Sequence, residues 1–123
     1  MSKTKCLIVD DHKVMRTMIK KMLGQERFDI QEAENGKQAL DILTKDEDIS
    51  LVICDVNMPV MDGLQLLDEK KKLDSHANTD VVIITSVRTD ALIEKVTEKG
   101  AAAWITKPFK KEKLDEVLSL IVC

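Results

Sequence analysis

Short apolar runs alternate along this chain with longer segments whose apolar residues recur at helical spacing. Four apolar runs bounded by polar turns are typical of strands, at residues 5–9, 51–54, 81–84 and 102–105, and a less apolar fifth run covers Phe28–Ala33. This alternation predicts five βα units in series. The first, third and fourth strands in this series are nearly all apolar, as expected of strands that are buried on both faces. We therefore expect a five-stranded parallel sheet with helices on both faces.

The composition limits the classes of protein that remain. The 123 residues have the size of one domain, and 44% hydrophobic with 33% charged residues is typical of a globular chain. No apolar run approaches the ~18 residues of a membrane span, so we expect no membrane partner. A net charge of −3 without a basic block argues against direct nucleic-acid binding. Three widely spaced cysteines, Cys6, Cys54 and Cys123, favour a reducing cytoplasm.

Polar residues follow the predicted strands where the strands end. Asp10 and Asp11 follow the first run, Asp55 follows the third, Thr85 the fourth, and Lys107 comes just after the last. In an open parallel sheet these ends share one edge, where ligands bind. If the first and third strands are neighbours, three carboxylates converge, and such crowding calls for a counter-charge. Mg²⁺, or Mn²⁺ in its place, fits a set of oxygen ligands of this kind.

Four motifs in this order identify a family resemblance. They are Val9-Asp10-Asp11, the run from Asp55 to Gly63, Thr85-Ser86, and Lys107-Pro108-Phe109. Together they resemble the receiver domain of two-component response regulators, most closely the single-domain chemotaxis-type regulators. The resemblance covers the whole chain. It implies a flavodoxin-like, doubly wound (βα)5 fold with strand order 2-1-3-4-5, and one receiver domain at 1–123 without an output domain.

The resemblance implies a metal site and a phosphoacceptor. Asp55 would take a phosphoryl group from a phosphohistidine, as a carboxylate nucleophile can. Asp11, Asp55 and the backbone carbonyl of Asn57 would ligate Mg²⁺, and Asp10 would hold the ion partly through water. Lys107 would neutralise charge on the phosphoryl oxygens.

The response to phosphorylation is expected at two further residues. By resemblance, Thr85 would hydrogen-bond the transferred group and Trp104 would change rotamer, although this position more often carries tyrosine or phenylalanine. The resemblance also implies a cis bond between Lys107 and Pro108. Val87, two residues beyond Thr85, is hypothesised to shield the acyl phosphate from water.

The expected partners are proteins. A histidine kinase or a histidine phosphotransfer protein would supply the phosphoryl group, and a downstream effector would bind the face formed by the fourth helix, fifth strand and fifth helix. The chain would be a monomer or a weak phosphorylation-dependent dimer. The wide apolar arc of the first helix, which includes Val14, Met15 and Met18, indicates either deep packing or a methionine edge that docks the donor protein.

Other functions remain as alternatives. The first is a receiver-like interaction domain that is never phosphorylated. The second is an aspartyl-phosphate phosphatase, but Asn57 occupies the place of its second, acid–base aspartate. A flavin module would need a small-residue phosphate loop where Asp10 and Asp11 stand. We therefore expect no enzyme activity on an external substrate. Of the two histidines, His12 is expected to turn away from the acidic pair and His76 to lie on the surface.

Overall fold

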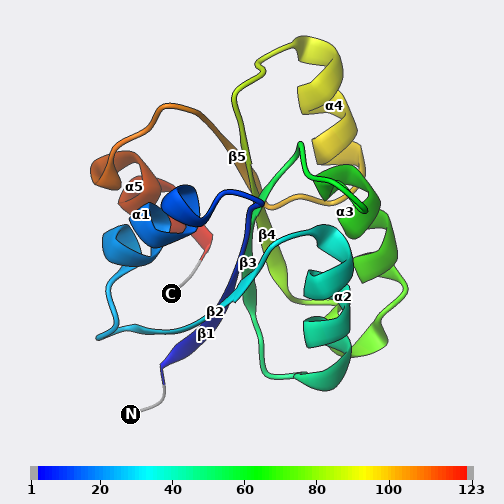
Figure 1. Ribbon diagram of the computed structural model, residues 1–123. Helices are drawn as coiled ribbons and strands as arrows, with labels where there is room; N and C mark the ends of the chain where they lie inside the picture. The colour runs from blue at the N-terminus through cyan, green and yellow to red at the C-terminus, as the bar shows by residue number, and fades with distance from the viewer. Residues whose placement is uncertain (1–2, 122–123) are drawn as a thin grey trace.

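The apolar runs form the strands of one parallel sheet in the computed structural model, which describes residues 3–121 (Figure 1). The strands are β1 (Thr4–Val9), β2 (Phe28–Ala33), β3 (Leu51–Asp55), β4 (Asp80–Thr85) and β5 (Ala103–Thr106). The helices are α1 (Lys13–Leu23), α2 (Gly36–Lys45), α3 (Gly63–Lys71), α4 (Asp90–Glu98) and α5 (Lys111–Ile121), with a 3₁₀ turn, η1 (Asp74–His76), before β4.

The sheet has the expected order, β2-β1-β3-β4-β5, and every pairing is parallel. In Figure 1, α1 and α5 cover one face of the sheet and α2, α3 and α4 cover the other. The five strands lie within one residue of their predicted bounds. This arrangement is the flavodoxin-like doubly wound fold, and it places a crevice between β1 and β3 where the strand order reverses.

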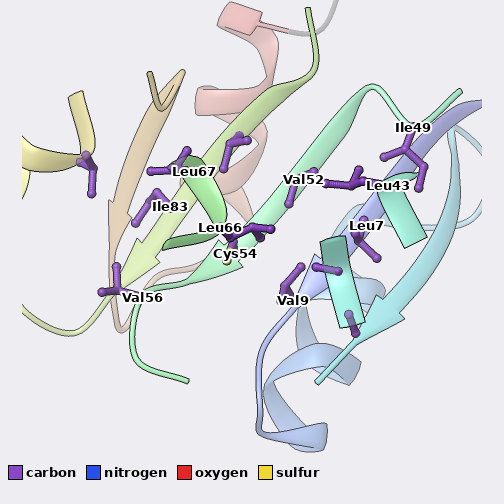
Figure 2. Packing of buried hydrophobic residues seen from close by; sticks show 14 residues of the cluster. Leu7, Val9, Leu43, Ile49, Val52, Cys54, Val56, Leu66, Leu67 and Ile83 are labelled. Carbon is purple, nitrogen blue, oxygen red and sulfur yellow. The ribbon is translucent and has the colours of Figure 1, made fainter. Parts of the chain in front are cut away.

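Two apolar clusters, one on each face, hold the helices to the sheet. On one face Leu43 of α2 and Leu66 and Leu67 of α3 pack against Val52 and Ile83 of the sheet, as Figure 2 shows. On the other face, residues of α1 and α5 such as Ile19 and Leu114 pack against the alternate strand positions. Burial of both sheet faces explains why the central strands are apolar throughout.

The two cysteines within the described residues lie on opposite faces. Cys6 belongs to the α1/α5 cluster and Cys54 to the α2/α3 cluster, and both are buried free thiols. Cys6 pairs with Leu51, three residues before Cys54, which confirms that the two thiols are out of register. Cys123 lies outside the described residues. Among residues 3–121, no helix has both the length and the apolar character needed to cross a membrane.

The loop from β3 to α3 is shaped by a turn and a cap. Asp62 accepts a hydrogen bond from the Gln65 amide, and Gln65 returns one to the Asp62 amide, which forms a capping box that starts α3. Gly63 comes next, and a Cβ there would lie 2.5 Å from the carbonyl oxygen of Asp55. Glycine therefore allows α3 to begin directly behind Asp55.

Candidate functional site

The predicted site residues meet at the carboxyl edge of the sheet. Asp10 follows β1, Asp55 is the last residue of β3, Thr85 is the last of β4, and Lys107 follows β5. The register aligns these ends, since Val9 pairs with Cys54, Asp55 with Ile84, and Thr85 with Thr106. The convergence of carboxylates expected from the sequence is therefore confirmed for Asp10 and Asp55.

Lys107 lies between these two carboxylates. Its Nζ is 3.4 Å from Oδ2 of Asp10 and 3.5 Å from Oδ2 of Asp55. Asp10 is 1% exposed and Asp55 is 6% exposed, so the ammonium group is the close counter-charge to two nearly buried acids. The Lys107 amide donates to the Thr85 carbonyl at 2.7 Å, which joins the residue after β5 to the end of β4. The bond between Lys107 and Pro108 is cis, as the resemblance implied.

Asp55 is held in one orientation by its own loop. Its Oδ1 accepts a hydrogen bond from the Val56 amide at 2.8 Å, which leaves Oδ2 facing Lys107. Burial raises the pKa of Asp55 above its ordinary value, and the opposing effect of Lys107 is smaller; the charge of Asp10 adds to the increase. The site therefore disfavours a second ionised carboxylate until further positive charge arrives.

Asp10 and Asp11 form a cluster with His12. The His12 amide donates to Oδ1 of Asp10 at 2.8 Å, and its ring Nδ1 lies 3.3 Å from that oxygen and 3.1 Å from Oδ1 of Asp11. The expectation that His12 turns away from the acidic pair is wrong, because the tight turn after Asp10 folds the ring back over both carboxylates.

The donor set at this edge fits a hard divalent cation. One ligand atom from each of Asp10, Asp11 and His12 lies within 4.8 Å of the others. Asp55 lies beside this cluster, because Lys107 contacts Oδ2 of both Asp10 and Asp55. Carboxylate oxygens in this number are the ligands that Mg²⁺ takes while keeping several waters. Asn57 lies two residues beyond Asp55 and is exposed, and its carbonyl as a ligand stays a prediction.

The Thr85 hydroxyl is engaged within its own loop. Its Oγ1 accepts from the Val87 amide at 3.0 Å and donates to the Val87 carbonyl at 3.2 Å. Thr85 is 4% exposed, whereas Val87 is exposed beside it. The contact of Thr85 with a phosphoryl group, and the shielding by Val87, both stay predictions.

Trp104 lies on β5, where it pairs with Ile83, two residues before Thr85. The half-buried indole packs against the α2/α3 cluster, and the guanidinium carbon of Arg88 lies 5.4 Å from the ring centroid. Both side chains line a groove of about 640 Å³ together with Phe109 and residues of α5. The rotamer change stays a prediction.

Arg16 is a site residue whose role the sequence analysis missed. It is 8% exposed, its Nη1 donates to the Asp10 carbonyl at 2.7 Å, and its Nε donates to Glu32 of β2 at 3.0 Å. The side chain therefore fixes the backbone that carries the acidic pair. A signal was available, because Arg16 is a charged residue three positions before Ile19 on the buried side of α1.

The fold and the residues at the carboxyl edge of its sheet define a class of protein. It is a doubly wound α/β protein with an acidic site, bridged by a lysine, at the point where the strand order reverses. A family model described as "Response regulator receiver domain" matches residues 6–119. The chain belongs to this family.

Individual relatives agree with this assignment. A chemotaxis protein CheY homolog of Campylobacter jejuni is 37% identical over 119 residues, which cover 93% of this chain and 92% of the relative. The structure of Vibrio cholerae CheY4 covers 98% of this chain and 100% of its own, with a TM-score of 0.91 and 27% identity. A Borrelia burgdorferi CheX–CheY complex with BeF3 and Mg²⁺ covers 98% and 90%, with a TM-score of 0.88 and 29% identity. The resemblance to chemotaxis-type receivers is thereby confirmed.

Proposed function

We propose that this chain is a phosphoacceptor receiver in which Asp55 takes a phosphoryl group from a partner phosphohistidine. The observation that carries the proposal is the position of Lys107, whose ammonium lies between the carboxylates of Asp10 and Asp55. A lysine held at that point neutralises negative charge arriving at Asp55, and charge neutralisation is most of the catalysis in phosphoryl transfer.

The residues divide the reaction between them. An oxygen of Asp55 attacks the phosphorus, the P–N bond to the donor imidazole breaks, and an acyl phosphate forms. Asp10, Asp11, Asp55 and the Asn57 carbonyl would hold Mg²⁺, or Mn²⁺, which when bound supplies positive charge to the phosphoryl oxygens. Lys107 pairs with a phosphoryl oxygen, and the Thr85 hydroxyl donates to another. Turnover is confined to Asp55 itself, so we propose no enzyme activity on an external substrate.

The donor would be a histidine kinase or a histidine phosphotransfer protein that docks beside the site. The first helix offers a surface for it, because Val14 is 73% exposed and Met18 44% exposed. Met15, Met18 and Met22 also line a small cavity against Lys107 and Phe109. Methionine adapts its shape to a partner surface, which favours the docking interpretation of this helix edge.

The output would be an altered affinity for an effector protein at the α4–β5–α5 face, where the groove at Trp104 lies. The chain would act as a monomer or a weak phosphorylation-dependent dimer. We place it in the reducing cytoplasm, in agreement with its buried free thiols. We propose protein partners alone, without nucleic acid or membrane.

The alternative is an interaction domain of the same fold that is never phosphorylated. The arrangement of Asp10 and Asp55 around Lys107 favours the phosphoacceptor, since an inactive domain has no need to hold two buried acids against one lysine.

Mass spectrometry of the intact chain tests the proposal. After incubation with acetyl phosphate and Mg²⁺ we expect the mass of one phosphoryl group to be added, and we expect no addition in Asp55→Asn. Asp41→Asn, an exposed aspartate of α2, is the matched control and should gain the group as the wild type does. No adduct in the wild type, or an adduct that persists in Asp55→Asn, would reject the proposal.

A further inference from the structure

We propose that Arg88 is a positioning residue that holds Trp104 in its present orientation. We further propose that the stack of Arg88 on Trp104 is lost when the Thr85 hydroxyl gives up its hydrogen bond to Val87. The inference deepens the proposed function and rests on it for the event that draws Thr85 away. The two contacts themselves are present in the structure.

The first contact is the stack of Arg88 on Trp104. The guanidinium carbon lies 5.4 Å from the indole centroid, within the distance at which a cation is attracted to an aromatic face. Trp104 sits on the edge strand β5, where one neighbouring strand, β4, supports it. The indole also packs against the α2/α3 cluster, and the stack with Arg88 adds a contact beside the open groove that both side chains line.

The second contact fixes the loop that carries Arg88. The Thr85 hydroxyl binds both the amide and the carbonyl of Val87, at 3.0 Å and 3.2 Å. Arg88 is the next residue, and the loop between Thr85 and α4 is exposed from Ser86 onward. The orientation of Arg88 therefore depends on a turn closed by one hydroxyl group.

The two contacts are coupled because the Thr85 hydroxyl has only one proton to donate. In the structure the Val87 carbonyl receives it. If Thr85 donates to a phosphoryl oxygen on Asp55, the Val87 carbonyl loses its partner, and only the hydrogen bond from the Val87 amide still closes the turn. The weakened turn lets Arg88 move with its loop, and the stack on Trp104 is lost.

The groove also contains carboxylates with which the displaced Arg88 side chain can pair. Glu112 and Glu116 of α5 line the same groove as Arg88 and Trp104. A guanidinium that leaves the indole can pair with these carboxylates, so both orientations have a partner for the charge. A second partner for the charge lowers the free energy of the displaced orientation, and a population shift requires such a second state.

A double-mutant cycle in the absence of any phosphoryl donor tests the coupling. Trp104 is the single tryptophan, so its emission and its quenching by acrylamide report on this site alone. Arg88→Gln should raise the ratio of displaced to stacked indole about two- to fivefold, the size expected for one partly exposed cation–π contact. Arg88→Lys, which keeps the charge, should restore part of the wild-type signal.

Thr85→Val removes the hydroxyl and should shift the emission in the same direction. In the Arg88→Gln background Thr85→Val should add nothing, because the residue that transmits the effect is gone. Arg27→Gln is the matched control, since Arg27 stacks on Phe28 at 5.6 Å and should leave Trp104 emission unchanged. Thermal unfolding followed by circular dichroism checks that each variant is folded.

Wild-type quenching in Arg88→Gln, or an equal shift from Thr85→Val in both backgrounds, would overturn the inference. Arg88 is exposed, so Arg88→Gln alone decides the matter if Thr85→Val fails to fold. Failure of the proposed function appears separately, as the absence of a phosphoryl adduct on Asp55, and leaves these measurements unaffected.

Discussion

The buried polar groups at the two ends of the sheet differ in whether each has its own hydrogen-bond partner. At the carboxyl end, two nearly buried carboxylates share one lysine, and burial raises the pKa of Asp55. At the opposite end, the buried imidazole of His76 has a partner at each nitrogen. Its Nε2 lies 2.6 Å from the Leu43 carbonyl, and its Nδ1 lies 2.8 Å from the Thr79 hydroxyl.

The network at the amino-terminal end joins distant segments. The Thr79 hydroxyl also donates to the Ile49 carbonyl at 3.0 Å, so one histidine and one threonine connect α2, the segment just before β3 and the turn η1. Buried polar groups with partners stabilise a fold, whereas crowded like charges destabilise it and remain available for chemistry. The comparison assigns stability to one end and reactivity to the other.

The largest effect should come from the lysine that bridges the acids. In Lys107→Met the rate of phosphorylation by acetyl phosphate should fall about 100-fold, the usual loss when one charge-stabilising donor is removed. The rate of adduct formation by mass spectrometry measures it. Lys110→Met, an exposed lysine three residues further on, should leave the rate unchanged. A rate in Lys107→Met within a few-fold of wild type would mean that the bridge has no part in the reaction.

The next effect should appear at the other end, in stability alone. His76→Leu leaves the buried Leu43 carbonyl without its donor and removes one of the two partners of the Thr79 hydroxyl, and should lower the free energy of unfolding by about 2–3 kcal/mol. Urea denaturation measures the loss. Ser75→Ala, an exposed change in the same turn, should stay within about 0.5 kcal/mol of wild type.

The phosphorylation rate of His76→Leu sharpens the comparison, and should equal that of the wild type under conditions where the variant is folded. A loss of rate would show that the two ends are coupled. A loss of stability no larger than that of Ser75→Ala would show that the network contributes little.

The sequence predicted the sheet and the position of the site, because both depend on regular patterns. Apolar runs mark the strands, and residues that follow parallel strands must share an edge. The placement of Asp10, Asp55 and Lys107 is therefore readable from their distance to each run. The cis bond before Pro108 came from the family resemblance, since nothing in the local sequence distinguishes it from a trans bond.

Side-chain orientation was not predictable in the same way. His76 was expected on the surface because it stands in the polar segment Ser75–Asp80, and that expectation is wrong. The turn η1 brings the ring against the Leu43 carbonyl, where the residue is 0% exposed. The partner is a backbone carbonyl 33 residues away, and no sequence pattern marks a carbonyl that lacks a donor. Likewise, the orientation of His12 and the engagement of Thr85 by Val87 depend on loop geometry rather than on periodicity.

A smaller effect is expected on the pH dependence of stability, which should involve Asp55 at the carboxyl end of the sheet. Because burial and Asp10 raise the pKa of Asp55, the ionised carboxylate destabilises the folded state. Asp55→Asn should therefore raise the free energy of unfolding at neutral pH without metal, by about 1 kcal/mol, a typical single-site effect.

The sign changes with pH in a defined way. Below the ordinary aspartate pKa both variants are neutral at this position and the gain should be absent. It should grow as pH rises towards the raised pKa of Asp55 and stay constant above it. Urea titrations between acid and neutral pH measure it, and Asp41→Asn should show no such rise. A gain that is independent of pH would place its cause outside the ionisation of Asp55.

The smallest effect concerns the backbone beside the site. Val60 has a φ of 70°, and the Met61 amide donates to the Pro59 carbonyl at 2.7 Å, so Val60 occupies the centre of a tight left-handed turn. A β-branched residue is strained there by about 1–2 kcal/mol, and its side chain is 75% exposed, which returns little burial energy.

Val60→Gly should therefore stabilise the fold, but by less than about 1 kcal/mol, because glycine loses about 0.5–1 kcal/mol of backbone entropy on folding. Val87→Gly is the matched control: it is also an exposed valine in a loop of this edge, but without a positive φ, so glycine there should only destabilise. Urea denaturation of the two variants gives the difference in sign. Equal losses in both would remove backbone strain from the carboxyl end, and the contrast between the two ends would then rest on charge alone.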